Sequence, residues 1–122
     1  MRTVLVAGDN ETCRDSILKV LAREGYNVQG VPDVDSALAA IHARAFDLVV
    51  CDYRMPGKTG LDLLAELKRE SSAVPVLMIS ACADAVVERR ALELGAAELM
   101  RKPIRRRELV DSAAKAMGGR YV

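Results

Sequence analysis

Aromatic residues are scarce in this chain, and its charges are balanced. Only 3% of the residues are aromatic, tryptophan is absent, and 18 lysines and arginines stand against 17 aspartates and glutamates, for a net charge of +1. A nearly neutral chain has no global field that would attract nucleic acid or an anionic membrane. Aromatic platforms on which bases could stack are also lacking. We therefore expect no membrane binding and no direct nucleic-acid binding by this domain.

Cysteine and histidine are too few and too scattered for a disulfide framework or a zinc site. Cys13, Cys51 and Cys82 form no CxxC pair, and His42 is the only imidazole. An odd, dispersed set of thiols is typical of a reducing compartment. Apolar runs of membrane-spanning length are absent, and charge follows the first hydrophobic residues too closely for a signal peptide. These features predict a cytoplasmic protein.

Short hydrophobic segments are what the chain has in abundance. Hydrophobic residues make up 51% of its 122 positions, enough for one core and too few for two domains. Apolar runs typical of buried strands alternate with amphipathic helical patterns. The predicted strands cover residues 3–7, 27–31, 48–52, 75–80 and 97–101, and the predicted helices cover residues 11–24, 33–45, 61–71, 85–94 and 105–117. We expect one domain over residues 1–119, with residues 120–122 as a tail or the start of a linker.

The alternation of strands and helices predicts a parallel sheet with helices on both faces. Five repeats are too few to close an eight-stranded barrel, so an open sheet is expected. The doubly wound order 2-1-3-4-5 suits a chain of this size and places the switch point between the first and third strands. The expected fold is therefore α/β: a flavodoxin-like (βα)5 three-layer sandwich around a parallel five-stranded sheet.

Local spacing supports two of the predicted helices. Gly25 follows the first helical pattern and can adopt the left-handed conformation that commonly closes a helix. The third helix is marked by the helical spacing of Leu61, Leu64, Ala65 and Lys68. It is expected to start after Gly60, which breaks the preceding segment.

Polar side chains stand at the carboxyl ends of four predicted strands: Asp9, Asp52, Ser80 and Lys102. In the order 2-1-3-4-5 they meet at one edge of the sheet, where open α/β sheets bind ligands. Two neighbouring carboxylates repel, and Mg²⁺ can relieve that repulsion while keeping several waters. A carboxylate can also accept a phosphoryl group, whose charge the lysine and the metal would neutralise while the serine donates a hydrogen bond. The residues alone predict a Mg²⁺-dependent aspartyl-phosphate site.

Four segments spread over nearly the whole chain resemble the signature blocks of response-regulator receiver domains in two-component signalling. They are VLVAGDNE, LVVCDYRMPGKTGLDLL, PVLMISACAD and LELGAAELMRKPI. The resemblance implies that Asp52 accepts the phosphoryl group and that Asp9, Asp52 and the carbonyl of Arg54 hold Mg²⁺. It implies that Ser80 is a switch hydroxyl and that Lys102 contacts the phosphoryl oxygens. The implied partners are a sensor histidine kinase or phosphotransfer protein upstream and an output domain or protein downstream.

Two positions agree with further features of this family and two depart from it. The resemblance implies that Gly60 is the loop glycine before the third helix and that the Lys102-Pro103 peptide is cis. Gly8 stands where the family usually has the first of two acidic residues, so we expect weaker Mg²⁺ binding and slower phosphoryl transfer. Leu99 stands where the family usually has an aromatic residue. We expect the conformational relay through the fourth helix and fifth strand to be altered or muted.

Basic residues cluster where the fifth predicted strand leads into the last helix. They are Arg101, Lys102, Arg105, Arg106 and Arg107. Cations in the first turn of a helix oppose its macrodipole, so they need compensation. One interpretation is a solvated face on which Glu108 and Asp111 compensate the charge. The other is a docking surface for an acidic partner or for the second subunit of a homodimer.

Three functions are compatible with these features. The first is a phosphorylatable receiver, whose own catalysis is at most autophosphorylation from a phosphodonor and autodephosphorylation. The second is a degenerate receiver that acts as a phosphorylation-independent interaction module, for which Gly8 and Leu99 argue. The third is a small phosphohydrolase with an aspartyl nucleophile, which would need a general acid or base beside Asp52, and none is visible. The retained Asp52, Ser80 and Lys102 favour the first.

Overall fold

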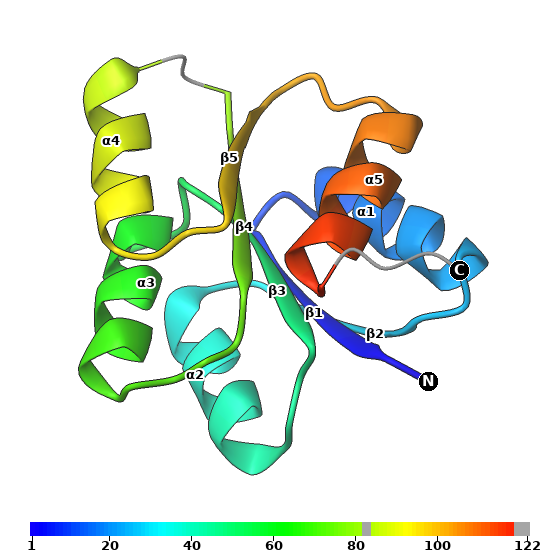
Figure 1. Ribbon diagram of the computed structural model, residues 1–122, viewed down its shortest axis with the longest axis horizontal. Helices are drawn as coiled ribbons and strands as arrows, with labels where there is room; N and C mark the ends of the chain where they lie inside the picture. Colours follow the sequence, from blue (N-terminus) through cyan, green and yellow to red (C-terminus); the bar gives the residue numbers. More distant parts are fainter. Residues whose placement is uncertain (82–83, 119–122) are drawn as a thin grey trace.

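Strands and helices alternate along the whole of the computed structural model, which describes residues 1–81 and 84–118 (Figure 1). The strands are β1 (Thr3–Ala7), β2 (Asn27–Val31), β3 (Leu48–Asp52), β4 (Val76–Ser80) and β5 (Glu98–Arg101). The helices are α1 (Glu11–Arg23), α2 (Val34–Ala43), α3 (Gly60–Arg69), α4 (Ala85–Glu93) and α5 (Arg106–Ala116). The predicted tail at 120–122 and Cys82 lie outside the described residues.

The strands pair in parallel in the order β2-β1-β3-β4-β5, which confirms the predicted topology. Register aligns their carboxyl ends: Ala7 lies opposite Cys51, and Asp52 lies opposite Ile79. Ser80, the last residue of β4, lies opposite Arg101. One edge of the sheet therefore collects the loops that follow β1, β3, β4 and β5.

The sheet divides the core into two apolar layers, because successive residues of a strand point to opposite faces. Leu5 packs in one layer with residues of α2, α3 and α4, whereas Val4 packs in the other with residues of α1 and α5. Figure 1 shows the same division, with α2, α3 and α4 on one side of the sheet and α1 and α5 on the other. The predicted three-layer sandwich is confirmed.

The buried face of α3 differs from the expected spacing. Of the four residues that marked this helix only Leu64 is buried, and its buried partners are Leu63, Leu67 and the first residue, Gly60. Side chains three, four and seven positions after Gly60 share its face. Since Gly60 packs against the sheet, that face becomes the inner one. Gly25 closes α1 with a left-handed φ of 92°, as expected.

Candidate functional site

The loops at the carboxyl edge of the sheet enclose a small cavity of about 110 Å³. Its lining residues are Asp9, Asn10, Asp52, Arg54, Ser80, Ala81 and Lys102. All five site residues predicted from the sequence are among them. The topology therefore brings together polar groups that lie up to 93 positions apart in the chain, counted from Asp9 to Lys102.

An ion pair between Asp52 and Lys102 lies at the centre of the site. The Lys102 ammonium is 3.1 Å from each oxygen of the Asp52 carboxylate, and the Asp52 side chain is 13% exposed. Burial raises the pKa of Asp52, the contact with Lys102 opposes that rise, and the charge of Asp9 adds to it. Burial alone would lower the pKa of Lys102, but hydrogen bonding and attraction to Asp52 raise it. The lysine is therefore held charged beside the carboxylate.

The donor set at this edge fits a hard divalent cation. Asp9 lies near enough for its charge to raise the pKa of Asp52, so the two carboxylates repel across the cavity. Within residues 1–81 and 84–118, no group of three or more His, Cys, Asp or Glu side chains is placed to enclose a metal. Mg²⁺ commonly takes one or two carboxylates and keeps several waters. Asp9, Asp52 and a backbone carbonyl such as that of Arg54 suit it.

Gly8 lies next to the side chain of Asp52. A Cβ atom built on Gly8 would lie 3.4 Å from Oδ2 of Asp52, at ordinary van der Waals distance. A side chain at this position would therefore stand next to the Asp52 carboxylate. An acidic side chain here would therefore add negative charge beside Asp52.

Gly60 allows the start of α3 to approach the backbone of Asp52. Its N–H donates to the carbonyl of Tyr53 at 2.7 Å. A Cβ on Gly60 would lie 2.8 Å from the carbonyl oxygen of Asp52 and 3.0 Å from Cε of Met78, too close for any side chain. Steric space therefore requires glycine here, and the hydrogen bond from its N–H holds the residue that follows β3 in place.

Ser80 and Lys102 are joined through the backbone. The N–H of Lys102 donates to the carbonyl of Ser80 at 2.9 Å, and Ser80 is only 2% exposed. The Lys102-Pro103 peptide is cis, which confirms the prediction. Leu99 of β5 is buried in the same core layer as Ala91 of α4.

Two residues near the site were missed from the sequence. Asn10 lines the cavity, and its Oδ1 accepts a hydrogen bond from the N–H of Cys13 at 2.9 Å, which caps α1. An asparagine directly before a helical pattern is a known cap signal and could have been found. Arg14 donates to the carbonyl of Gly8 at 2.8 Å. No spacing rule predicts such a contact, since its acceptor is the backbone.

The basic run is divided among separate acidic groups. Three of its residues form ion pairs: Arg101 with Glu88 at 3.5 Å, Arg106 with Glu24 at 3.7 Å, and Lys102 with Asp52. Glu108 accepts from the backbone N–H of Arg105 at 3.3 Å. The prediction that Glu108 and Asp111 would compensate the run is thus incomplete, because Glu24 and Glu88 from other helices take part. These pairs depend on tertiary packing, which brings the end of α1 next to α5 and α4 next to β5.

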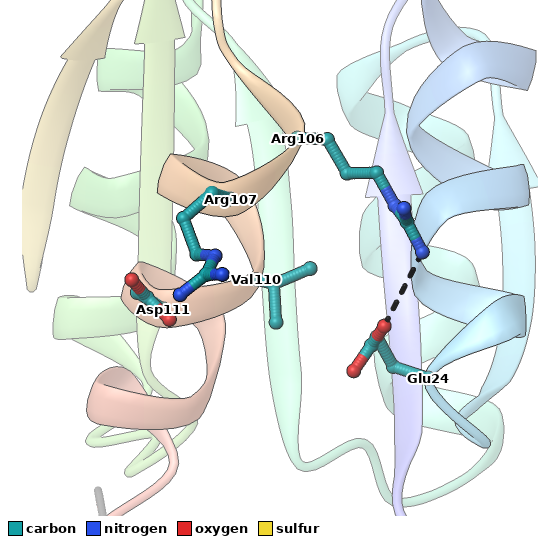
Figure 2. A pocket seen from close by; sticks show the side chains of 5 residues that line it. All are labelled: Glu24, Arg106, Arg107, Val110 and Asp111. Atoms are coloured by element: carbon teal, nitrogen blue, oxygen red, sulfur yellow. Dashed lines mark ion pairs between the residues drawn. The ribbon is translucent and has the colours of Figure 1, made fainter.

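The α5 face is hollowed where it meets the end of α1. A cavity of about 550 Å³ is lined by Glu24, Arg106, Arg107, Val110 and Asp111. Figure 2 shows Arg106 reaching from α5 to Glu24, while Arg107 and Asp111 lie together on the other side of that helix. Arg106 therefore has an acidic partner on this face, in Glu24.

Complete burial raises the pKa of the Cys51 thiol to about 12, with a smaller contribution from Asp52, so it behaves as an apolar core residue. None of the described helices is both long and apolar enough to cross a bilayer.

Fold and site together define an α/β domain with an acidic and lysine-bearing pocket at the carboxyl edge of a 2-1-3-4-5 sheet. Comparison with known families agrees: the model of the response regulator receiver domain matches residues 4–114. The chain therefore belongs to the response regulator receiver domain family. This confirms the family and the flavodoxin-like fold expected from its sequence.

Known relatives share this domain over about half of their own length. The chain is 36% identical over 110 residues to the sensory transduction protein RegX3 of Mycolicibacterium smegmatis, covering 90% of the chain and 48% of RegX3. It is 33% identical over 111 residues to the phosphate regulon transcriptional regulatory protein PhoB of Escherichia coli, covering 89% and 48%. Among solved structures, the receiver domain of NtrX from Brucella abortus is 34% identical, with a TM-score of 0.89 and coverage of 96% and 99%.

Proposed function

We propose that this domain is a phosphorylation-dependent switch of a two-component phosphorelay, with Asp52 as the acceptor. The observation that carries the proposal is the convergence of Asp52, Lys102 and Ser80 with Asp9 in one small cavity. An oxygen of the Asp52 carboxylate would attack the phosphorus of a phosphohistidine. A phosphorus–oxygen bond forms, the phosphorus–nitrogen bond breaks, and the electron pair returns to the imidazole of the donor.

The residues around Asp52 have distinct roles in this proposal. The Lys102 ammonium, now 3.1 Å from both carboxylate oxygens, would follow the transferred charge onto the phosphoryl oxygens. The Ser80 hydroxyl, on the adjacent strand end, would donate to one phosphoryl oxygen. Asp9, Asp52 and the Arg54 carbonyl would hold Mg²⁺, which when bound supplies neutralisation of the phosphoryl charge. Autophosphorylation from a small phosphodonor and autodephosphorylation are the only catalysis assigned to the chain.

A histidine kinase or phosphotransfer protein is the proposed donor, and a groove beside the site supports this partner. The groove is about 440 Å³ in volume and is lined by Cys13, Ser16, Ile17, Lys102, Pro103 and Ile104. It is largely apolar apart from Lys102, whose ammonium also contacts Asp52. A partner that docks here can bring a phosphorylated side chain to the acceptor. The cytoplasmic location expected from the cysteines stays a prediction.

An output domain or protein is the proposed receiver of the signal. RegX3 and PhoB are about twice as long as the matched segment, so the activity of those whole proteins is not transferred to this chain.

A homodimer through the basic residues at the start of α5 is also proposed. Charge reversal at Arg105 and Arg106 should weaken self-association, measured by analytical ultracentrifugation. Charge reversal at Lys19 is the control and should leave self-association unchanged. Unchanged association would remove this part of the proposal.

The experiment that tests the switch is phosphorylation with acetyl phosphate and Mg²⁺, followed by intact mass. A gain of one phosphate in the parent that is absent in Asp52→Asn would support the proposal. If no adduct forms, and beryllofluoride does not bind, the chain acts as a phosphorylation-independent interaction module. That alternative is not favoured. Gly8 lacks one carboxylate, but Asp52, Ser80 and Lys102 still line the same cavity. A phosphohydrolase would require a general acid or base beyond these groups.

A further inference from the structure

Arg14 ties the first residue of the β1–α1 loop to helix α1. Its Nη1 donates to the carbonyl oxygen of Gly8 at 2.8 Å in a partly buried position. The N–H of Gly8 donates to the carbonyl of Val31 at 3.0 Å. Both backbone polar groups of Gly8 are therefore bonded, one to the neighbouring strand and one to a charged side chain. A charged donor makes the second bond the stronger kind.

Gly30 of β2 provides the space in which the Arg14 side chain lies. A Cβ on Gly30 would be 2.9 Å from Cδ1 of Leu18 and 3.3 Å from Cδ of Arg14. The backbone of Gly30 is not in the left-handed region, so this glycine serves space rather than conformation. A methyl group at this position would press on the end of the Leu18 side chain and on the stem of Arg14, so it is expected to shift the guanidinium from its place on Gly8.

Asp9 lies between two anchored neighbours. The carbonyl that Arg14 holds belongs to the peptide joining Gly8 to Asp9. On the other side, Asn10 is fixed by its hydrogen bond to the N–H of Cys13. Gly8 itself has no side chain to limit its backbone, and glycine has the greatest conformational freedom of any residue. Without Arg14, the peptide that carries Asp9 would lose the restraint on its carbonyl side.

We propose that Arg14 is a positioning residue for Asp9, acting through the carbonyl of Gly8 in a channel opened by Gly30. The inference rests on the proposed function, since it takes Asp9 as a Mg²⁺ ligand. Arg14 does not line the cavity, and its contact on this side is the Gly8 carbonyl, so the positioning effect proposed here passes through the backbone. The expected loss is a rise of about tenfold in the Kd for Mg²⁺, the lower end of what removing a group that orients a metal ligand costs.

The test measures metal affinity and backbone order in the full chain. Arg14→Met keeps most of the apolar stem and removes the donor, Arg14→Lys keeps a charge, and Lys19→Met changes an exposed residue on the same helix. Isothermal titration with Mg²⁺ should give a Kd about tenfold higher for Arg14→Met, a smaller rise for Arg14→Lys and no change for Lys19→Met. In metal-free protein, ¹⁵N relaxation should show a lower order parameter for the Asp9 amide in Arg14→Met alone.

A double-mutant cycle adds the role of Gly30. Gly30→Ala should weaken Mg²⁺ binding in the parent but not in an Arg14→Ala background, because the displaced group is already gone. If Arg14→Met fails to fold, Gly30→Ala alone tests the inference through its Kd for Mg²⁺. Equal Mg²⁺ affinity in parent and Arg14→Met overturns the inference and leaves the proposed switch intact. A parent that binds no Mg²⁺ overturns both, and the two failures are therefore distinguishable.

Discussion

Restoring a carboxylate at Gly8 is the most direct test of how charge is arranged around Asp52. Gly8→Asp would place an acidic side chain next to Oδ2 of Asp52, since its Cβ would lie 3.4 Å from that atom. In the metal-free protein the new charge repels Asp52 and Asp9, and it raises the pKa of Asp52 further. When a divalent cation enters, the same charge becomes attractive.

The size of the effect follows from Coulomb's law. Two like charges about 4 Å apart repel by about 1 kcal/mol in water and about 4 kcal/mol at an effective dielectric constant of 20. The Asp52 side chain is 13% exposed, so an intermediate value of about 2 kcal/mol is reasonable. The metal-free Gly8→Asp protein should therefore lose about 2 kcal/mol of unfolding free energy. Release of that repulsion on metal binding should tighten the Kd for Mg²⁺ by roughly 30-fold.

Isothermal titration with Mg²⁺ and urea unfolding with and without the ion would measure both quantities. Gly8→Asn is the matched control, because it has nearly the same shape and no charge. We expect Gly8→Asn to bind Mg²⁺ like the parent. If Gly8→Asp binds no more tightly than Gly8→Asn, then charge at this position does not limit affinity and the reasoning fails.

Three further changes probe the same edge of the sheet. Because its pKa is raised, ionised Asp52 destabilises the metal-free fold above that pKa, and the cost disappears as the pH falls below the unfolded-state value. Asp52→Asn should thus raise Tm at pH 7 and not at pH 3 in calorimetry; equal gains would contradict this. Lys102→Met should slow phosphorylation by acetyl phosphate by about 10²- to 10³-fold, followed by intact mass, and a parental rate would exclude Lys102 from charge stabilisation. Gly60→Ala should cost about 1–3 kcal/mol in urea unfolding because its Cβ would lie 2.8 Å from the Asp52 carbonyl; an unchanged midpoint would show that α3 can shift freely.

The elements and the members of the site were predictable because each rests on a local signal. An apolar run that stops at Asp52 or Ser80 indicates a strand end, and the parallel order then brings such ends together. The inner face of α3 was not predictable from spacing alone. That face is set by the close approach of Gly60 to the backbone of Asp52. This is a tertiary contact, and helical spacing within α3 does not indicate it.

Contacts that end on the backbone were the others to be missed. The contact of Arg14 is one of them, because its acceptor is the backbone carbonyl of Gly8 and the pattern of side chains along the sequence does not indicate it. The partners of Arg106 and Arg101 were missed for a related reason. Glu24 directly follows α1 and Glu88 lies on α4, and both are far from these arginines in sequence, so only the packing of those helices could reveal them.

The two apolar layers share no side chain, and this insulates one face of the sheet from the other. A change in packing around Leu21, under α1 and α5, touches nothing that packs around Leu67 on the opposite face. Truncations at these two positions should therefore add almost independently. Substitutions in one layer therefore need no compensating substitutions in the other. Coupling between the two faces is therefore expected to pass through the strands and through side chains at the edge of the sheet such as Lys102, which contacts Asp52 and also lines the groove beside α1.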